Sequence, residues 1–178
     1  MDIALVIFIS YLSGSIPFGL ILTKIFSDED IRKIGSGNIG ATNVLRTGNK
    51  FLAIATLFLD ISKGYIPVII VQQYFPELIY LSCLLAFLGH VFPIWLKFKG
   101  GKGVATYLGI LIALSYQLSF LFIFTWLVVS LIFRYSSVSS MFSSMTVFVI
   151  SLIRETALPI LLVINEKTSN SELSTTLN

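Results

Sequence analysis

Long apolar runs separated by short polar segments dominate the chain. A helix needs about 20 apolar residues to cross the hydrocarbon core of a bilayer. The runs cover about residues 3–23, 51–74, 78–96, 104–133 and 138–153. The fourth run is too long for one span, and polar residues at 115–119 divide it into two short ones. The pattern predicts an all-α integral membrane protein with six to seven mostly short, partly kinked transmembrane helices.

Two features inside these runs are unusual for helices that face lipid. The segment 13–19 contains Pro17 and two glycines, which predicts a kink that packs against other helices. Asp60 and Lys63 lie three residues apart in the second run, on one helical face where they can pair. An ion pair within a membrane span marks a functional site or locks helices together, and the sequence leaves both interpretations open.

Composition supports the membrane assignment and excludes several other classes. The chain has 178 residues, of which 56% are hydrophobic and 12% charged, against about 25% charged in soluble domains. Asp2 and the length of the first run are unlike a secretory signal peptide. The single cysteine, Cys83, excludes a disulfide within the chain. We expect the lipid bilayer as a partner, and no nucleic acid, cofactor or metal.

The positions of the cations predict the orientation. Five of the twelve lysines and arginines lie between residues 24 and 50, and three more are Lys97, Lys99 and Lys102. Two spans joined by a cation-free turn separate these segments, so both lie on one side of the membrane. The positive-inside rule makes that side cytoplasmic and places the N-terminus outside. The two segments, both rich in glycine, therefore form cytoplasmic loops that face each other.

The first of these loops contains the stretch Gly35–Arg46. Its glycines let the backbone adopt positive φ angles and approach a ligand closely. The guanidinium group of Arg46 is planar and can donate two parallel hydrogen bonds to a phosphate. Neutral donors and two of the glycines complete the candidate site: Gly35, Ser36, Gly37, Asn38, Thr42 and Asn43. The stretch predicts a site that holds anions and orients a hydroxyl, and the alternative is a solvated loop of turn residues.

The second loop combines lysines with glycines before an apolar run. Its backbone N–H and ammonium groups can surround a phosphate, and the following helix start favours anions. A positive-inside anchor is the alternative. His90, the only histidine, could bind a phosphate or act as a base, or could be a packed residue. The candidate phosphate-binding residues here are His90, Lys97, Lys99, Gly100, Gly101, Lys102, Gly103 and Thr106.

Two long motifs resemble those of the bacterial acyl-phosphate:glycerol-3-phosphate acyltransferases. The stretch Gly35–Arg46 is similar to their first motif, and Gly89–Thr106 is similar to the second. The segments 13–19 and 59–64 also resemble family features, and the match covers about residues 1–135.

The resemblance implies a membrane enzyme of phospholipid synthesis in the bacterial inner membrane. Such an enzyme transfers a fatty acyl group from acyl phosphate to the 1-hydroxyl of glycerol 3-phosphate, giving lysophosphatidic acid and phosphate. Ser36, Arg46 and Lys102 are the candidate catalytic residues, and the other motif residues are assigned to substrate binding. We expect a monomer or a weak oligomer.

The C-terminal region departs from the family pattern. The family usually ends with another span and a basic third motif, whereas residues 154–178 have no histidine and no full span. We expect a single transmembrane domain over residues 1–164 and a polar, disordered tail over 165–178. A truncated, non-catalytic family member, an acyltransferase with a thioester donor and a transporter of a phosphorylated solute stay open as alternatives.

Overall fold

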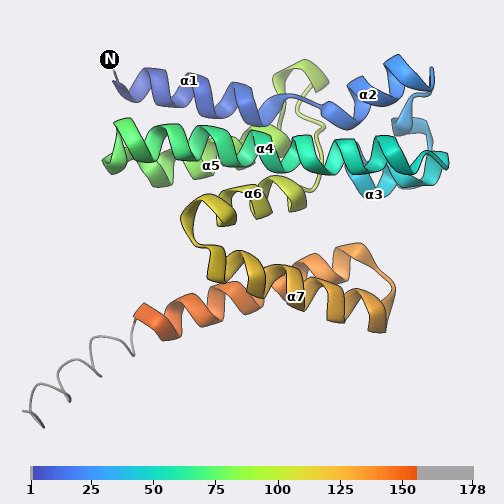
Figure 1. The fold of residues 1–178 in the computed structure, drawn as a ribbon. Helices are drawn as coiled ribbons and strands as arrows, with labels where there is room; N and C mark the ends of the chain where they lie inside the picture. Colours follow the sequence, from blue (N-terminus) through green and yellow to red (C-terminus); the bar gives the residue numbers. More distant parts are fainter. Residues whose placement is uncertain (1, 156–178) are drawn as a thin grey trace, which may run out of the picture. The chain divides into compact units, whose positions relative to one another are not determined.

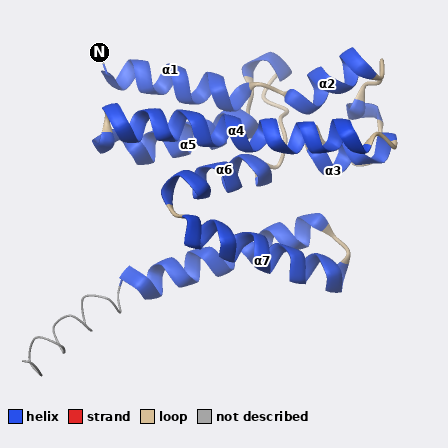
Figure 2. Cartoon of the chain, viewed as in Figure 1, coloured by secondary structure: helices blue, strands red, loops and turns tan. Residues whose placement is uncertain are grey.

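The computed structural model describes residues 2–155 (Figure 1), and every regular element in this range is a helix (Figure 2). The chain divides into two compact units, Met1–Phe120 and Leu121–Asn178. The long helices are α1 (Asp2–Ser15), α2 (Phe18–Phe26), α4 (Lys50–Tyr74), α5 (Ile79–Val91), α6 (Val104–Leu114), α7 (Tyr116–Phe133) and Ser136–Glu155. The short ones are η1 (Ile31–Lys33), α3 (Ala41–Val44), η2 (Leu45–Thr47), η3 (Pro76–Leu78) and η4 (Ile94–Leu96).

The described residues contain four helical segments that are long and apolar enough to cross a membrane. They are Lys50–Tyr74, Pro76–Leu96, Tyr116–Phe133 and Ser136–Glu155, and the bent pair α1 and α2 makes a fifth if it is one span. Helix α6 has 11 residues, which is about 16 Å and roughly half of a bilayer core. The all-α membrane fold is confirmed, whereas the count of six to seven spans is not.

The predicted kink and the predicted break are both present. Helices α1 and α2 are bent by 42° around Pro17, whose ring and missing N–H interrupt the helix. Ser115 separates α6 from α7 with an extended φ of −163°. Pro67, by contrast, is buried within α4, which continues through it to Tyr74.

Glycines allow the helices of the first unit to pack closely. A Cβ atom on Gly14 of α1 would overlap the Ala86 carbonyl of α5. On the other side of α4, a Cβ on Gly109 of α6 would overlap the Ile61 carbonyl. Small residues at helix contacts are the usual means of close approach in membranes. These contacts hold α5 against α1 and α6 against α4.

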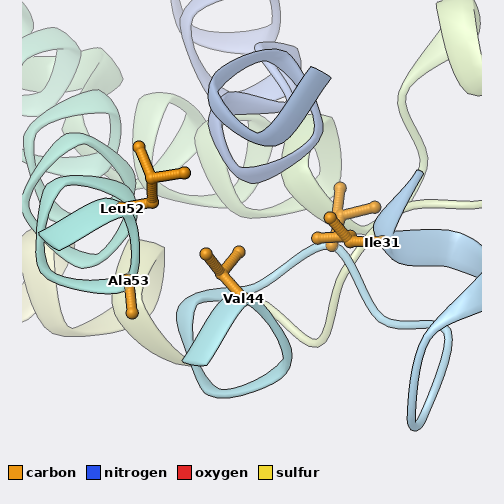
Figure 3. Close-up of a cluster of buried hydrophobic side chains, with 5 residues drawn as sticks. Ile31, Val44, Leu52 and Ala53 are labelled. Carbon is orange, nitrogen blue, oxygen red and sulfur yellow. The ribbon is translucent and has the colours of Figure 1, made fainter. Parts of the chain in front are cut away.

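A small apolar core fixes the first polar loop beneath the start of α4. Ile31, Ile39, Val44, Leu52 and Ala53 are buried together (Figure 3). Asn49 begins α4 because its side chain accepts a hydrogen bond from the Leu52 N–H at 3.1 Å. The loop is therefore packed at its base against the start of α4.

The described part of the second unit consists of most of α7 and the helix Ser136–Glu155. The rings of Phe133 and Phe142 stack at 6.1 Å between centroids. The serine-rich helix satisfies its hydroxyls internally, since Ser143 donates to the Ser139 carbonyl at 2.7 Å. The predicted run 138–153 is thus helical. The expected domain end at 164 and the tail 165–178 lie outside the described residues.

Candidate functional site

A single buried side chain, Asn43, organises the first motif. Its Nδ2 atom donates to the carbonyls of Ile31, Ile34 and Asn38 at 2.8–3.0 Å. Its Oδ1 atom accepts from the backbone N–H and the hydroxyl of Ser36, at 3.1 and 3.2 Å. Asn43 is 2% exposed. Its contacts are those of a residue that positions the loop.

Ser36 and Arg46 lie on the outer side of this loop. Both are exposed, and Gly35, which precedes Ser36, has a φ of +54°. A Cβ on Gly35 would lie 2.5 Å from Cδ and Nη1 of Arg46, so the guanidinium crosses the glycine backbone. Gly37 also has a positive φ, of +68°. The backbone at these two positions requires glycine and brings the hydroxyl and the guanidinium to one surface.

The second motif is held by His90, at the end of α5. The His90 carbonyl accepts from the Gly101 N–H at 3.1 Å, and its Nδ1 atom lies 3.1 Å from the Thr106 hydroxyl. A Cβ on Gly101 would overlap His90 Nε2, and one on Gly100 would overlap the His90 carbonyl. His90 and Thr106 are buried. The imidazole therefore supports the glycine loop from beneath.

The lysines of the second motif point outward from this support. Lys97, Lys99 and Lys102 are exposed. Gly103 is buried with a φ of +76°, and a Cβ there would overlap the ring of Phe87. Its carbonyl accepts the Tyr107 N–H at 2.7 Å, so α6 begins directly after the glycines.

Contacts within the first unit bring the two motifs close together. Leu96 of the second motif packs against the apolar core that contains Ile39 and Val44 of the first. Gly19 of α2 lies against the Ile39 carbonyl and against Thr56 of α4. The predicted convergence of the two glycine-rich loops is consistent with these contacts.

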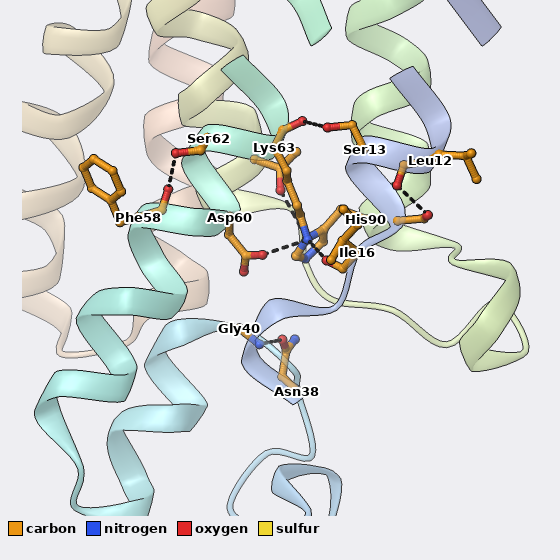
Figure 4. Close-up of polar contacts among 12 residues, drawn as sticks. Leu12, Ser13, Ile16, Asn38, Gly40, Phe58, Asp60, Ser62, Lys63 and His90 are labelled. Atoms are coloured by element: carbon orange, nitrogen blue, oxygen red, sulfur yellow. Dashed lines mark hydrogen bonds and ion pairs between the residues drawn. The ribbon is translucent and has the colours of Figure 1, made fainter. Parts of the chain in front are cut away.

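The Asp60–Lys63 pair lies inside the same unit. Lys63 Nζ is 2.7 Å from Asp60 Oδ1, and the two side chains are 2% and 3% exposed. Nζ also donates to the Ile16 carbonyl at 2.6 Å, where α1 breaks from α2. Figure 4 shows Lys63 reaching between Asp60 and Ile16 with His90 beside it. The predicted pairing is confirmed.

The predicted site residues thus fall into two sets. Ser36, Thr42, Arg46, Lys97, Lys99 and Lys102 are exposed, and Gly35 and Gly37 lie with them. Asn43, His90, Gly103 and Thr106 are buried, while Asn38, Gly100 and Gly101 are intermediate. The exposed set can meet a substrate directly, and the buried set shapes the loops. Their assignment to catalysis and substrate binding stays a prediction.

Sequence reasoning missed the contacts that anchor the second motif to α1. Trp95 Nε1 donates to the Ser15 carbonyl at 2.8 Å, and the Tyr11 hydroxyl donates to the Phe92 carbonyl at 2.7 Å. The Tyr11–Phe92 hydrogen bond joins residues 81 apart in the sequence, and no local sequence pattern predicts it. Within residues 2–155, no group of three or more His, Cys, Asp or Glu side chains is placed to hold a metal ion.

Exposed cations and a hydroxyl on two glycine loops, set on close-packed membrane helices, are typical of a membrane protein that binds phosphorylated molecules. The chain belongs to the glycerol-3-phosphate acyltransferase family, whose model matches residues 4–172. The glycerol-3-phosphate acyltransferase of Pelagibacter ubique is 60% identical over 147 residues, covering 83% of this chain and 77% of the relative. That of Wolbachia pipientis wMel is 55% identical, covering 82% and 77%.

Solved structures agree with the family assignment. The crystal structure of PlsY (YgiH), an integral membrane glycerol 3-phosphate acyltransferase, in its glycerol 3-phosphate form has a TM-score of 0.80 and 32% identity. The match covers 98% of this chain and 93% of that one. Its lysophosphatidic acid form has a TM-score of 0.79 and 35% identity, covering 86% of this chain and 77% of that one. This chain is therefore an integral membrane protein of the acyltransferase class.

Proposed function

We propose that this protein transfers a fatty acyl group from acyl phosphate to the 1-hydroxyl of glycerol 3-phosphate. The products are lysophosphatidic acid and phosphate. The family assignment and the likeness to PlsY, whose solved forms are a glycerol 3-phosphate form and a lysophosphatidic acid form, support this reaction. The main structural observation for this reaction is that Ser36 and Arg46 are both exposed on one loop. Hydrogen bonds of the buried Asn43 side chain hold the interior of that loop.

The chemistry requires no covalent intermediate on the protein. An acyl phosphate is a mixed anhydride, so its carbonyl carbon is already activated. The glycerol oxygen attacks that carbon, the bond from the carbon to the phosphate oxygen breaks, and the departing phosphate takes the hydroxyl proton. The protein has to bring two phosphate-bearing substrates together and offset their charge. Arg46 and Lys102 supply the positive charge, and Ser36 orients a reacting oxygen.

The proposal also includes the side of the membrane on which the reaction takes place. The loops that carry Arg46 and Lys102 face the cytoplasm, with the N-terminus on the outer side of a bacterial inner membrane, as the positive-inside rule indicates. The enzyme works as a monomer or a weak oligomer.

The first experiment measures phosphate release by the purified protein with palmitoyl phosphate and glycerol 3-phosphate. We expect release to require both substrates. Ser36→Ala should lower kcat by about 100-fold, the size of effect seen when one positioned donor is removed, with a smaller change in KM. The matched control is Ser62→Ala, since the Ser62 hydroxyl donates to the Phe58 carbonyl of its own helix at 2.9 Å.

The outcomes separate the alternatives. Unchanged turnover in Ser36→Ala would remove Ser36 from the mechanism. Formation of lysophosphatidic acid and free thiol from an acyl thioester, with no reaction of acyl phosphate, would identify a different donor. A folded protein that releases no acyl product from either donor would favour a non-catalytic family member.

A further inference from the structure

We propose that Lys63 is a positioning residue that couples the two motifs. From the centre of α4, its ammonium donates a hydrogen bond to the backbone at the break between α1 and α2. The inference rests on the proposed function, because positioning is measured through the reaction. It also resolves the choice that the sequence left open for the Asp60–Lys63 pair: the pair acts on the site, through the loops that form it.

The first observation is that Lys63 holds the end of α1 at two points. Its ammonium donates to the Ile16 carbonyl, and its own backbone carbonyl accepts the Ser13 hydroxyl at 3.0 Å. Asp60 neutralises the ammonium in a place that solvent hardly reaches. A buried ammonium needs both a counter-charge and acceptors, and here the acceptor is a carbonyl of another element. The pair therefore joins α4 to the break.

The second observation is that the break leads to both motifs. Beyond it, Gly19 of α2 lies against Ile39 of the first motif. Before it, the Ser15 carbonyl accepts the indole N–H of Trp95 in the second motif. Lys63 thus forms a hydrogen bond to the backbone between Ser15, which contacts the second motif, and Gly19, which contacts the first. A shift of this backbone moves both contacts together.

The third observation concerns the far side of α4. Gly64, next to Lys63, lies against the Thr106 carbonyl, and Thr106 also bonds His90. His90 supports Gly101. The same turn of α4 therefore meets the second motif directly as well as through α1. In an acyl transfer between two bound phosphates, a displacement of about 1 Å between the loops is enough to lower turnover about 100-fold.

The experiment must separate positioning from simple helix locking. Lys63→Met alone leaves a buried carboxylate without its partner and destabilises the fold. The informative variant is the neutral pair Asp60→Asn with Lys63→Met, which removes the donor to Ile16 and leaves no unpaired charge. We expect it to fold and to lose kcat by about tenfold or more, with KM for glycerol 3-phosphate within about threefold. Lys63→Arg, which keeps a cationic donor, should retain more turnover than the neutral pair.

A second variant tests the same coupling without altering a buried charge. Trp95→Phe removes the N–H that reaches Ser15, together with part of the ring, from a side chain that is 54% exposed. We expect kcat to fall several-fold while the melting temperature stays close to that of the unmodified protein. The matched control is Trp126→Phe, because Trp126 Nε1 has no hydrogen-bond partner among the described residues. That control should leave kcat unchanged.

The results distinguish this inference from the proposed function. If the unmodified protein releases phosphate and the folded neutral pair retains its kcat, the pair only locks helices and the inference is overturned alone. If the neutral pair does not fold, Trp95→Phe decides, and unchanged turnover there overturns the coupling. If the unmodified, folded protein is inactive with both substrates, the proposed function and the inference are both overturned.

Discussion

The two motifs present similar chemistry to a substrate, yet they are held in place in different ways. The first is held from within, because the partners of Asn43 lie only 5 to 12 residues away in the sequence. The second is held from outside as well: Ser15 and Tyr11 of α1 contact it across 80 and 81 residues respectively. A locally bonded loop keeps its shape when distant helices move, whereas the second loop depends on the whole first unit.

The strongest test of the local loop is Asn43→Asp. The carboxylate keeps the acceptor for Ser36 and loses the donors to three carbonyls, which it would then repel. Leaving buried carbonyls unpaired costs about 1–3 kcal/mol each, so we expect kcat/KM in the phosphate-release assay to fall about 100-fold or more.

Asn49→Asp is the matched control for that change. The Asn49 side-chain oxygen accepts the Leu52 N–H, and a carboxylate does the same at a helix start. We expect near-normal activity there. Equal losses in the two variants would mean that a carboxylate in place of either amide is poorly tolerated, and the picture of a single organising residue would have to be abandoned.

A smaller effect is expected when one hydrogen bond inside the second motif, between Thr106 and His90, is removed. Thr106→Val keeps the shape of the side chain and leaves His90 Nδ1 without its partner, so the free energy of unfolding should drop by about 1–3 kcal/mol. Thr56→Val is the control, because Thr56 is equally buried and donates to the Leu52 carbonyl of its own helix at 2.7 Å. Thermal unfolding in detergent measures both.

One outcome of the comparison between Thr106→Val and Thr56→Val would contradict a special role for the Thr106–His90 hydrogen bond. If Thr56→Val costs as much stability as Thr106→Val, the hydrogen bond to His90 contributes nothing beyond the loss of a buried hydroxyl. The second motif would then be held by backbone contacts and by Trp95 and Tyr11 instead.

The same distinction explains what the sequence could predict. The spans, the break at Ser115 and the kink at Pro17 follow from run length and from proline geometry, which are local properties. The Asp60–Lys63 contact follows from a spacing of three on a helix. Each of these predictions needed only residues within one continuous stretch of the chain.

The division of the motif residues into exposed and buried sets could not be predicted in this way. Asn38 and Asn43 look alike in the sequence, yet only Asn43 is buried, because Ile31 and Ile34 fold back around it. The role of His90 depends on Thr106 and Gly101 meeting it after the chain has turned through the second loop. Tertiary packing alone decides which polar side chains are enclosed.

The smallest expected effect concerns the outer edge of the first loop. Asp30 caps η1 by accepting the Arg32 N–H at 3.1 Å, and the Arg32 guanidinium lies 2.8 Å from its carboxylate. The side-chain hydrogen bond from Arg32 lowers the pKa of the Asp30 carboxyl from 3.8 to about 2. A lowered pKa in the folded state stabilises the fold above the ordinary pKa, and this contribution is lost as the pH falls through the folded value.

The prediction is therefore confined to acid conditions and compares the protein with Asp30→Asn. The difference in melting temperature between the two should be small and constant above about pH 5, and it should shrink between about pH 4 and pH 2. Both partners are accessible to water, so added salt should reduce the difference as well. A difference that persists unchanged to pH 2 would show that the cap acts through its shape rather than its charge. The first loop would then depend still more on Asn43, whose neutral amide is independent of pH in this range.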